Sequence, residues 1–322
     1  MEEVESDTYL GDIISRNGKN TLNIENRVSK GLGIVSLIMD ILKNVSFGIH
    51  YFEIAATLRE AILVNGLLTN SEVWFGLSDS EVTKIEEVDR LLLRQIFQVA
   101  STCPIEALYL ELGCVPIGIT IKARRMKYIH HLATSSEDEM LTKVFQAQWD
   151  HPCGKNEWTE EVKKNFKEFG LEADLNWLRS KSKDFFKSLV KKQSKELAID
   201  QLNETKEKHS KMDKIDYYEL KMQDYLKNDK ISVKQARILF KYRTRMARFW
   251  ENFKAGRPPQ PCPVCKDVLS VDTQGHSFNC KTLTENVGIY GNYEDIFSSQ
   301  IDDQTVKSVE KIEKFREIYK EQ

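Results

Sequence analysis

The sequence predicts a mainly α-helical protein with a small metal-binding module near its C-terminal end. Apolar residues recur at helical rather than alternating spacing over most of the 322 residues, and only seven prolines and fifteen glycines interrupt them. Three of the six cysteines fall, together with a histidine, inside one short window. We therefore expect a helical bundle, a helical connector and a small CCHC zinc knuckle, in that order.

Composition limits the classes of protein to which the chain can belong. Its length suits two or three domains of about 100–200 residues each. The net charge of −2 means that any nucleic-acid surface must arise from local segregation of charge. The acidic start argues against a secretory signal, and charged residues interrupt every apolar window that could span a membrane. The remaining cysteines are scattered, which favours a reducing intracellular compartment, nucleus or cytoplasm; they are Cys103, Cys114 and Cys153.

The first half of the chain reads as one extended segment followed by helices. Residues 8–15 are extended and end at a turn near Gly18. Apolar periodicity and helix-start signals then predict successive helices over 22–44 and 49–69, and others that begin near Ser78, Pro104, Pro116 and Ser136. Two of these starts, Ser78 to Glu81 and Ser136 to Glu139, have the pattern of a capping box.

The second half is richer in charge. Lysine-rich helices balanced by glutamate are expected over 158–169 and 182–209. A helix over 231–250, capped by Ser232 and Gln235, follows them. The last helix, over 303–321, begins at Asp302 and Asp303, where the helix dipole favours acidic residues. We therefore interpret this carboxylate pair as a helix start and not as a catalytic metal site.

Basic residues segregate on the helix predicted over 231–250. Five of them recur at intervals of three or four residues and so share one face: Lys234, Arg237, Lys241, Arg245 and Arg248. Between 234 and 257, only Glu251 offsets eight basic residues. Such a stripe is typical of phosphate contact, although an ordinary solvated helix face is the alternative. A weaker basic patch comprises Lys122, Arg124, Arg125 and Lys127, with Tyr128, His130 and His131 beside them.

The cysteine window has the spacing of a zinc site. Cys262 and Cys265 are separated by two residues, ten residues follow, and His276 and Cys280 are separated by three. Zn²⁺ takes four tetrahedral nitrogen or sulfur ligands, and a site closed by four protein ligands is structural. The first pair would bind from a tight turn and the second from one turn of a short helix. Unrelated reduced cysteines are the alternative. Glycine-rich phosphate loops and hydrolase motifs are absent, so no small-molecule substrate is inferred.

These features, taken in order, resemble the C-terminal third of the reverse transcriptases of non-LTR (LINE-type) retrotransposons. The resemblance covers about Thr8 to Cys280. It rests on the following segments: Tyr-Leu-Gly-Asp-Ile-Ile-Ser from Tyr9, Leu58 to Glu60, Asn70 to Trp74, Leu92 to Ile96, Leu108 to Gly113, and the Cys-Pro-x-Cys, His and Cys residues of the zinc motif.

The resemblance implies a division of the chain and a function. Its parts would be a remnant of the palm–thumb junction (1–20), a helical thumb-like domain (21–150), a helical connector with the basic helix (151–257), the knuckle (258–284) and a tail helix (285–322). The catalytic palm of the family has no counterpart here, so we expect a fragment that binds RNA or DNA without being an enzyme. One alternative is a helical protein–protein interaction module or a non-functional relic. Another is part of an active RNA-directed DNA polymerase whose palm is supplied elsewhere.

Overall fold

The computed structural model describes residues 5–9, 11–44, 50–151, 157–208, 211–253, 256–298 and 300–320. Leu10, in the Tyr-Leu-Gly-Asp element, and Cys153 lie outside these ranges. The chain divides into two compact units, each assembled from three segments. The first unit comprises 1–38, 57–92 and 115–201, and the second comprises 39–56, 93–114 and 202–322. The predicted domain boundaries at 150 and 257 do not coincide with this division.

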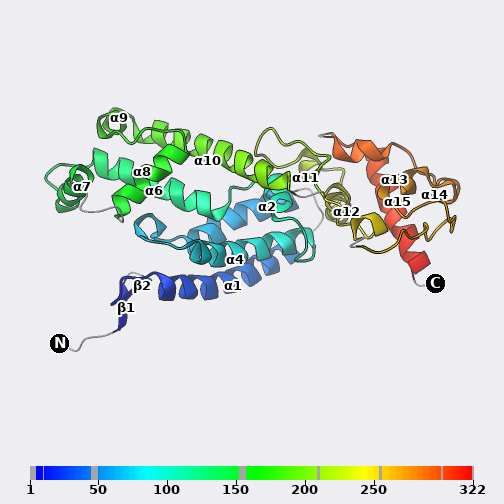
Figure 1. Ribbon diagram of the computed structural model, residues 1–322, viewed down its shortest axis with the longest axis horizontal. Coiled ribbons are helices and arrows are strands. Elements are labelled where there is room, and N and C mark those ends of the chain that lie inside the picture. The colour runs from blue at the N-terminus through cyan, green and yellow to red at the C-terminus, as the bar shows by residue number, and fades with distance from the viewer. Residues whose placement is uncertain are drawn as a thin grey trace. The chain divides into compact units, whose positions relative to one another are not determined.

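The first unit starts with a hairpin and is otherwise helical (Figure 1). Strand β1 (Ser6–Tyr9) pairs antiparallel with β2 (Asp12–Ser15), with Thr8 opposite Ile13. The helical elements that lie wholly or partly in this unit are α1 (Thr21–Lys43), α2 (Tyr51–Leu58), the π-helix η1 (Arg59–Val64), α3 (Asn65–Leu67), the 3₁₀ turn η2 (Ser71–Val73), α4 (Asp79–Phe97), α6 (Ile117–Thr134), α7 (Met140–Asp150), α8 (Trp158–Glu168), α9 (Leu175–Arg179) and α10 (Lys183–Lys206).

Helix α6 is the centre of the first unit, because η2, α7, α8 and α9 all pack against it. Gly31 lets α1 approach a neighbouring side chain closely, because a Cβ at this position would lie 2.6 Å from Leu67 Cδ2. The core also contains a charged pair. Arg59 donates from Nε and Nη2 to the two carboxylate oxygens of Asp89, at 2.6 Å each, and both side chains are buried.

The predicted helix starts are confirmed in part. At Ser78 the capping box forms: Ser78 N donates to Glu81 Oε2 at 3.0 Å, and Glu81 N donates to Ser78 Oγ at 3.3 Å. The capping box at Ser136 is wrong, because α7 begins at Met140 and its N-cap, Glu139, makes no side-chain cap. Pro104 and Pro116 occupy the N-cap positions of α5 and α6, one residue before the predicted first turn.

The second unit combines helices with the cysteine window. Its elements are α5 (Ile105–Leu112), α11 (Asp224–Lys227), α12 (Val233–Arg243), the 3₁₀ turn η3 (Trp250–Asn252), α13 (Gln274–Asn279), α14 (Lys281–Val287), the 3₁₀ turn η4 (Tyr293–Phe297) and α15 (Asp303–Lys320). Helix α12 packs against α11, α15 and η4, and α14 packs against α13 and α15. The mainly helical class predicted from the sequence is therefore confirmed. As predicted, Asp302 caps α15, with its carboxylate accepting from the backbone N–H groups of Gln304 and Thr305.

Helix α12 is shorter than predicted. Its capping box at Ser232 and Gln235 forms, but the helix ends at Arg243 instead of near residue 250. Arg245 takes a left-handed conformation (φ 50°), and the N–H groups of Met246 and Ala247 both donate to the carbonyl of Lys241, at 2.7 and 3.0 Å. This closes the helix in the manner of a C-terminal cap that usually uses glycine. The stripe of five basic residues on one helix is therefore wrong, since Arg245 and Arg248 follow the helix.

Within the described ranges, none of the helices is long and apolar enough to cross a membrane.

Candidate metal centre

A short hairpin positions the first two cysteines. Pro261 and Val271 form an antiparallel bridge, and Cys262 N donates to the carbonyl of Ser270 at 2.8 Å. Between them the chain turns back tightly, with Lys266 N donating to the carbonyl of Cys262 at 2.9 Å. Cys262 and Cys265 therefore approach the centre from the same turn, as their spacing predicts.

A capped helical turn positions the other two ligands. Thr273 is the N-cap of α13, and its Oγ1 accepts from His276 N at 2.9 Å. Cys280 is the C-cap of the same helix and the N-cap of α14. The short helix predicted between His276 and Cys280 is therefore confirmed.

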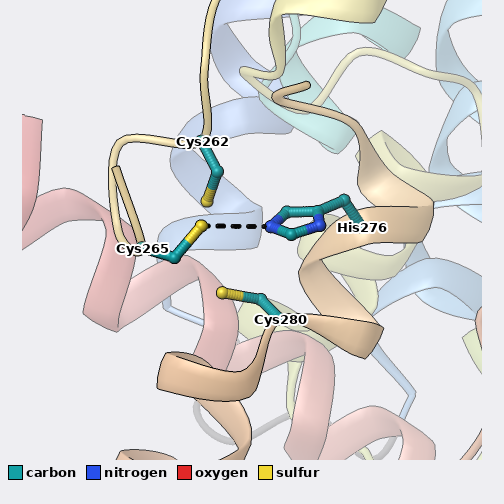
Figure 2. A group of neighbouring side chains, drawn as sticks. All are labelled: Cys262, Cys265, His276 and Cys280. Atoms are coloured by element: carbon teal, nitrogen blue, oxygen red, sulfur yellow. Dashed lines mark hydrogen bonds between the residues drawn. The ribbon is translucent and has the colours of Figure 1, made fainter. Parts of the chain in front are cut away.

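The four side chains converge (Figure 2). One ligand atom from each of Cys262, Cys265, His276 and Cys280 lies within 4.8 Å of all the others. Cys265 Sγ and His276 Nε2 are 3.5 Å apart. A tetrahedral ion with bonds of about 2.0–2.3 Å needs ligand separations of about 3.3–3.8 Å, so small side-chain movements complete the site. The cluster can thus hold a metal ion, and its three sulfurs and one imidazole suit Zn²⁺.

Burial sets the protonation of the ligands before a metal binds. It raises the pKa of the Cys262 thiol and raises the pKa of Cys280 to about 11. It lowers the pKa of His276, which keeps the imidazole neutral and able to coordinate. At neutral pH the thiols of Cys262 and Cys280 carry protons, so a metal must displace these protons when it binds.

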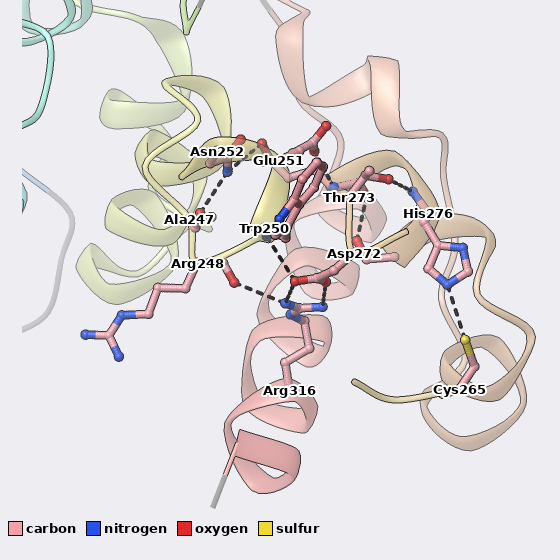
Figure 3. A network of polar contacts seen from close by, with 12 residues as sticks. Ala247, Arg248, Trp250, Glu251, Asn252, Cys265, Asp272, Thr273, His276 and Arg316 are labelled. Carbon is pink, nitrogen blue, oxygen red and sulfur yellow. Dashed lines mark hydrogen bonds and ion pairs between the residues drawn. The ribbon is translucent and has the colours of Figure 1, made fainter. Parts of the chain in front are cut away.

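A buried ion pair ties this module to two other segments of the second unit (Figure 3). Arg316 of α15 donates to both carboxylate oxygens of Asp272, at 2.6 and 3.1 Å, and to the carbonyl of Arg248 at 3.0 Å. Asp272 also accepts from Trp250 N at 3.0 Å, and Glu251 Oε1 accepts from Gln274 N at 2.5 Å. The residue that follows the hairpin bridge therefore fixes the backbone from Arg248 to Glu251.

The structure separates the five predicted basic residues of the second unit into two groups. Arg237 donates to the carbonyl of Ile96 at 2.8 Å and to Tyr51 Oη at 2.7 Å, and Arg245 pairs with Asp213 at 3.0 Å. The other three, Lys234, Lys241 and Arg248, form no ion pair with any carboxylate among the described residues. Figure 3 shows the Arg248 side chain pointing away from the Asp272 network.

Three of the four basic residues in the patch predicted in the first unit have partners within the protein. Lys122 pairs with Glu168 at 2.5 Å, and Arg124 donates to the carbonyl of Leu68 at 2.7 Å. Arg125 is buried, pairs with Glu161 at 3.1 Å and donates to the carbonyl of Trp74.

Sequence reasoning missed the partners that organise the site. Thr273 could have been found, because a threonine three residues before His276 is a helix-start signal. Arg316 gave no signal, since it lies in a charged helix 44 positions from Asp272. The pairing of Arg243 with Glu111, at 3.0 Å and with both side chains buried, was equally hidden.

Comparisons of the chain with protein-family models, with curated proteins and with solved structures found no match.

Proposed function

We propose that the second unit is a zinc-stabilised module that binds RNA or DNA through its phosphate backbone. Cys262, Cys265, His276 and Cys280 would hold one structural Zn²⁺. The proposal depends chiefly on one observation: Lys234, Lys241 and Arg248 have no ion-pair partner among the described residues and line two cavities.

The two cavities meet at one residue and share one helix. Lys241 and Arg248 line a cavity of about 610 Å³, and Lys234 and Arg237 line another of about 730 Å³. Gln98 lines both. Lys234 interacts electrostatically with Glu310, and Glu313 and Glu317 line the cavity of Lys241 and Arg248. Cations beside a concave surface attract phosphates, and here no ion pair among the described residues has to be broken on binding.

The metal centre contributes by holding one of these cations in place. Arg248 has its backbone carbonyl bound by Arg316, which is bound in turn by Asp272 of the zinc module. A small module of this kind has little core of its own, so metal binding is expected to be coupled to its folding. Zinc would therefore act on nucleic-acid binding indirectly, through the Arg316 contact.

The salt dependence of binding tests this function. Each neutralised phosphate contributes about −0.7 to the log–log salt slope for single strands and about −0.9 for duplex DNA. Replacing Lys234, Lys241 and Arg248 together with glutamine should flatten the slope by about two units for single strands and by about two to three units for duplex DNA. The matched control replaces Lys84, Lys192 and Lys208 with glutamine, which removes the same number of charges. Each of these lysines pairs with a carboxylate elsewhere in the protein. Equal slopes for the two triple variants, or no binding by the wild type, would contradict the proposal.

The resemblance to a reverse transcriptase fragment adds an expectation about activity. Among the described residues, the side chains that could hold a metal ion together are three cysteines and a histidine. No set of carboxylates in the described part of the chain is placed to hold two catalytic metal ions. We expect no primer extension on a poly(A)–oligo(dT) substrate with Mg²⁺ or Mn²⁺. DNA synthesis above a mock preparation would favour the alternative that the chain is part of an active polymerase.

One observation favours a second candidate function, protein–protein interaction. Val268 and Leu269, on the loop between the ligand pairs, are 84% and 89% exposed. Adjacent exposed apolar side chains are a common feature of contact surfaces. If this loop serves only a protein partner, replacing both residues with serine leaves the nucleic-acid salt slope unchanged.

A further inference from the structure

The cavity beside Arg248 contains an exposed aromatic ring as well as cations. Phe253 lines it, together with Lys241, Met246 and Arg248, and is 41% exposed. Lys211 Nζ lies 4.8 Å from the centre of the Phe253 ring and 3.8 Å from Met246 Sδ. The ring is therefore supported by a neighbouring cation, while part of its surface stays open to the cavity.

This combination matches the chemistry of an unpaired nucleotide. Proteins that bind single strands pair cations, which follow the phosphates, with aromatic side chains on which bases stack. A cavity of about 610 Å³ falls within the usual range for small-molecule sites. Bases within a duplex are stacked on one another, so they cannot enter such a cavity without unpairing.

The acidic residues of the cavity indicate how the nucleotide would be oriented. Glu313 and Glu317 of α15 line it as well, and Glu313 accepts from Tyr242 Oη at 3.4 Å. Carboxylates repel phosphate but accept hydrogen bonds from the amino groups of bases. The phosphate would thus lie beside Lys241 and Arg248, with the base between Phe253 and the carboxylates.

We propose that this cavity binds one unpaired nucleotide of a single-stranded nucleic acid, with the base stacked on Phe253. The inference rests on the proposed nucleic-acid binding and specifies its substrate class. It adds base stacking on Phe253 to the phosphate contacts of the basic residues, which do not by themselves need an aromatic ring.

Fluorescence anisotropy with the zinc-loaded full chain tests the inference, with a short labelled oligo(dC) and a duplex of the same length as probes. Phe253→Ala should weaken oligo(dC) binding about five- to a hundredfold, which is the usual effect of losing one stacked base, and should leave duplex binding unchanged. Phe253→Trp should retain the affinity, which separates stacking from a folding defect. The matched control is Phe185→Ala, since Phe185 is 52% exposed and also has a lysine, Lys181, over its ring.

The possible outcomes separate this inference from the proposed function. If Phe253→Ala binds oligo(dC) like the wild type, or weakens single strands and duplex equally, the inference is overturned. The proposed function then stands as long as the triple variant of Lys234, Lys241 and Arg248 still has a flatter salt slope than its matched control. If the wild type binds neither probe, both proposals fail.

Discussion

The two units use similar basic residues in opposite ways. In the first unit Lys122, Arg124 and Arg125 all contact carboxylates, carbonyls or amides of the protein itself. In the second, Lys241 and Arg248 line a cavity without an ion-pair partner among the described residues. The comparison teaches that partners distant in sequence can neutralise a basic cluster, so only the residues that such partners leave without an ion pair remain candidates for ligand contact.

Removing a metal ligand should produce the largest difference between the two units in zinc content and hydrogen-exchange protection. Cys265→Ser should abolish binding of one zinc ion per chain and remove hydrogen-exchange protection from residues 260–285, while the first unit keeps its protection. Elemental analysis and hydrogen exchange measure both effects. Cys103→Ala is the control, because Cys103 is buried outside the cluster and should leave the zinc content unchanged. Unchanged zinc content in Cys265→Ser would disprove the ligand assignment.

Acid should have the same effect as the ligand substitution. The pKa of Cys280 is about 11 because the thiol is buried, so binding of the metal has to remove a proton. Zinc affinity should therefore fall as the pH falls and rise as it rises. A zinc titration at several pH values measures this dependence, and an affinity independent of pH would contradict thiolate coordination.

A substitution in the first unit should affect stability and not binding. Arg125→Met leaves the buried carbonyl of Trp74 without its side-chain donor and Glu161 without its partner. The free energy of unfolding should fall by about 1–3 kcal/mol or more. Chemical denaturation measures the loss, and anisotropy of the folded variant should show an unchanged salt slope. A flattened slope would mean that the first unit also contacts phosphates.

The smallest expected effects come from two single lysines. Lys122→Gln removes a partly exposed pair with Glu168, which is worth at most about 1 kcal/mol, and should leave nucleic-acid affinity unchanged. Lys241→Gln should leave stability unchanged, because no ion pair within the described chain is lost, and should flatten the salt slope by about 0.7–0.9. Chemical denaturation of both variants measures the change in stability, and anisotropy measures the change in salt slope. Only Lys122→Gln should change the first, and only Lys241→Gln the second.

Local patterns predicted much of the fold. Apolar periodicity predicted the helix over 22–44, and lysine-rich amphipathic patterns balanced by glutamate predicted those over 158–169 and 182–209; the structure confirms each within a few residues. Periodicity suffices there because a buried helix face repeats every three to four residues whatever its partner. The end of α12 could not be predicted, since the left-handed residue that closes it is Arg245 and not a glycine.

The candidate metal site was more predictable than its surroundings. The four ligands lie within nineteen residues, so spacing alone brings them together. The partners of the basic residues were not predictable, because they lie far along the chain: Glu168 is 46 positions from Lys122, and Asp272 is 44 from Arg316. Whether a cation binds a ligand or the protein itself depends on these distant contacts.

The central claim is that the zinc module holds Arg248 where it can contact a phosphate. The most direct measurement is the salt slope of oligo(dC) binding, with and without zinc, for the wild type and for Arg248→Gln. We predict that removing zinc flattens the wild-type slope by about 0.7, the share of one contact on a single strand, and leaves the slope of Arg248→Gln unchanged. Equal flattening in both proteins, or none in either, would contradict the link from Asp272 through Arg316 to Arg248.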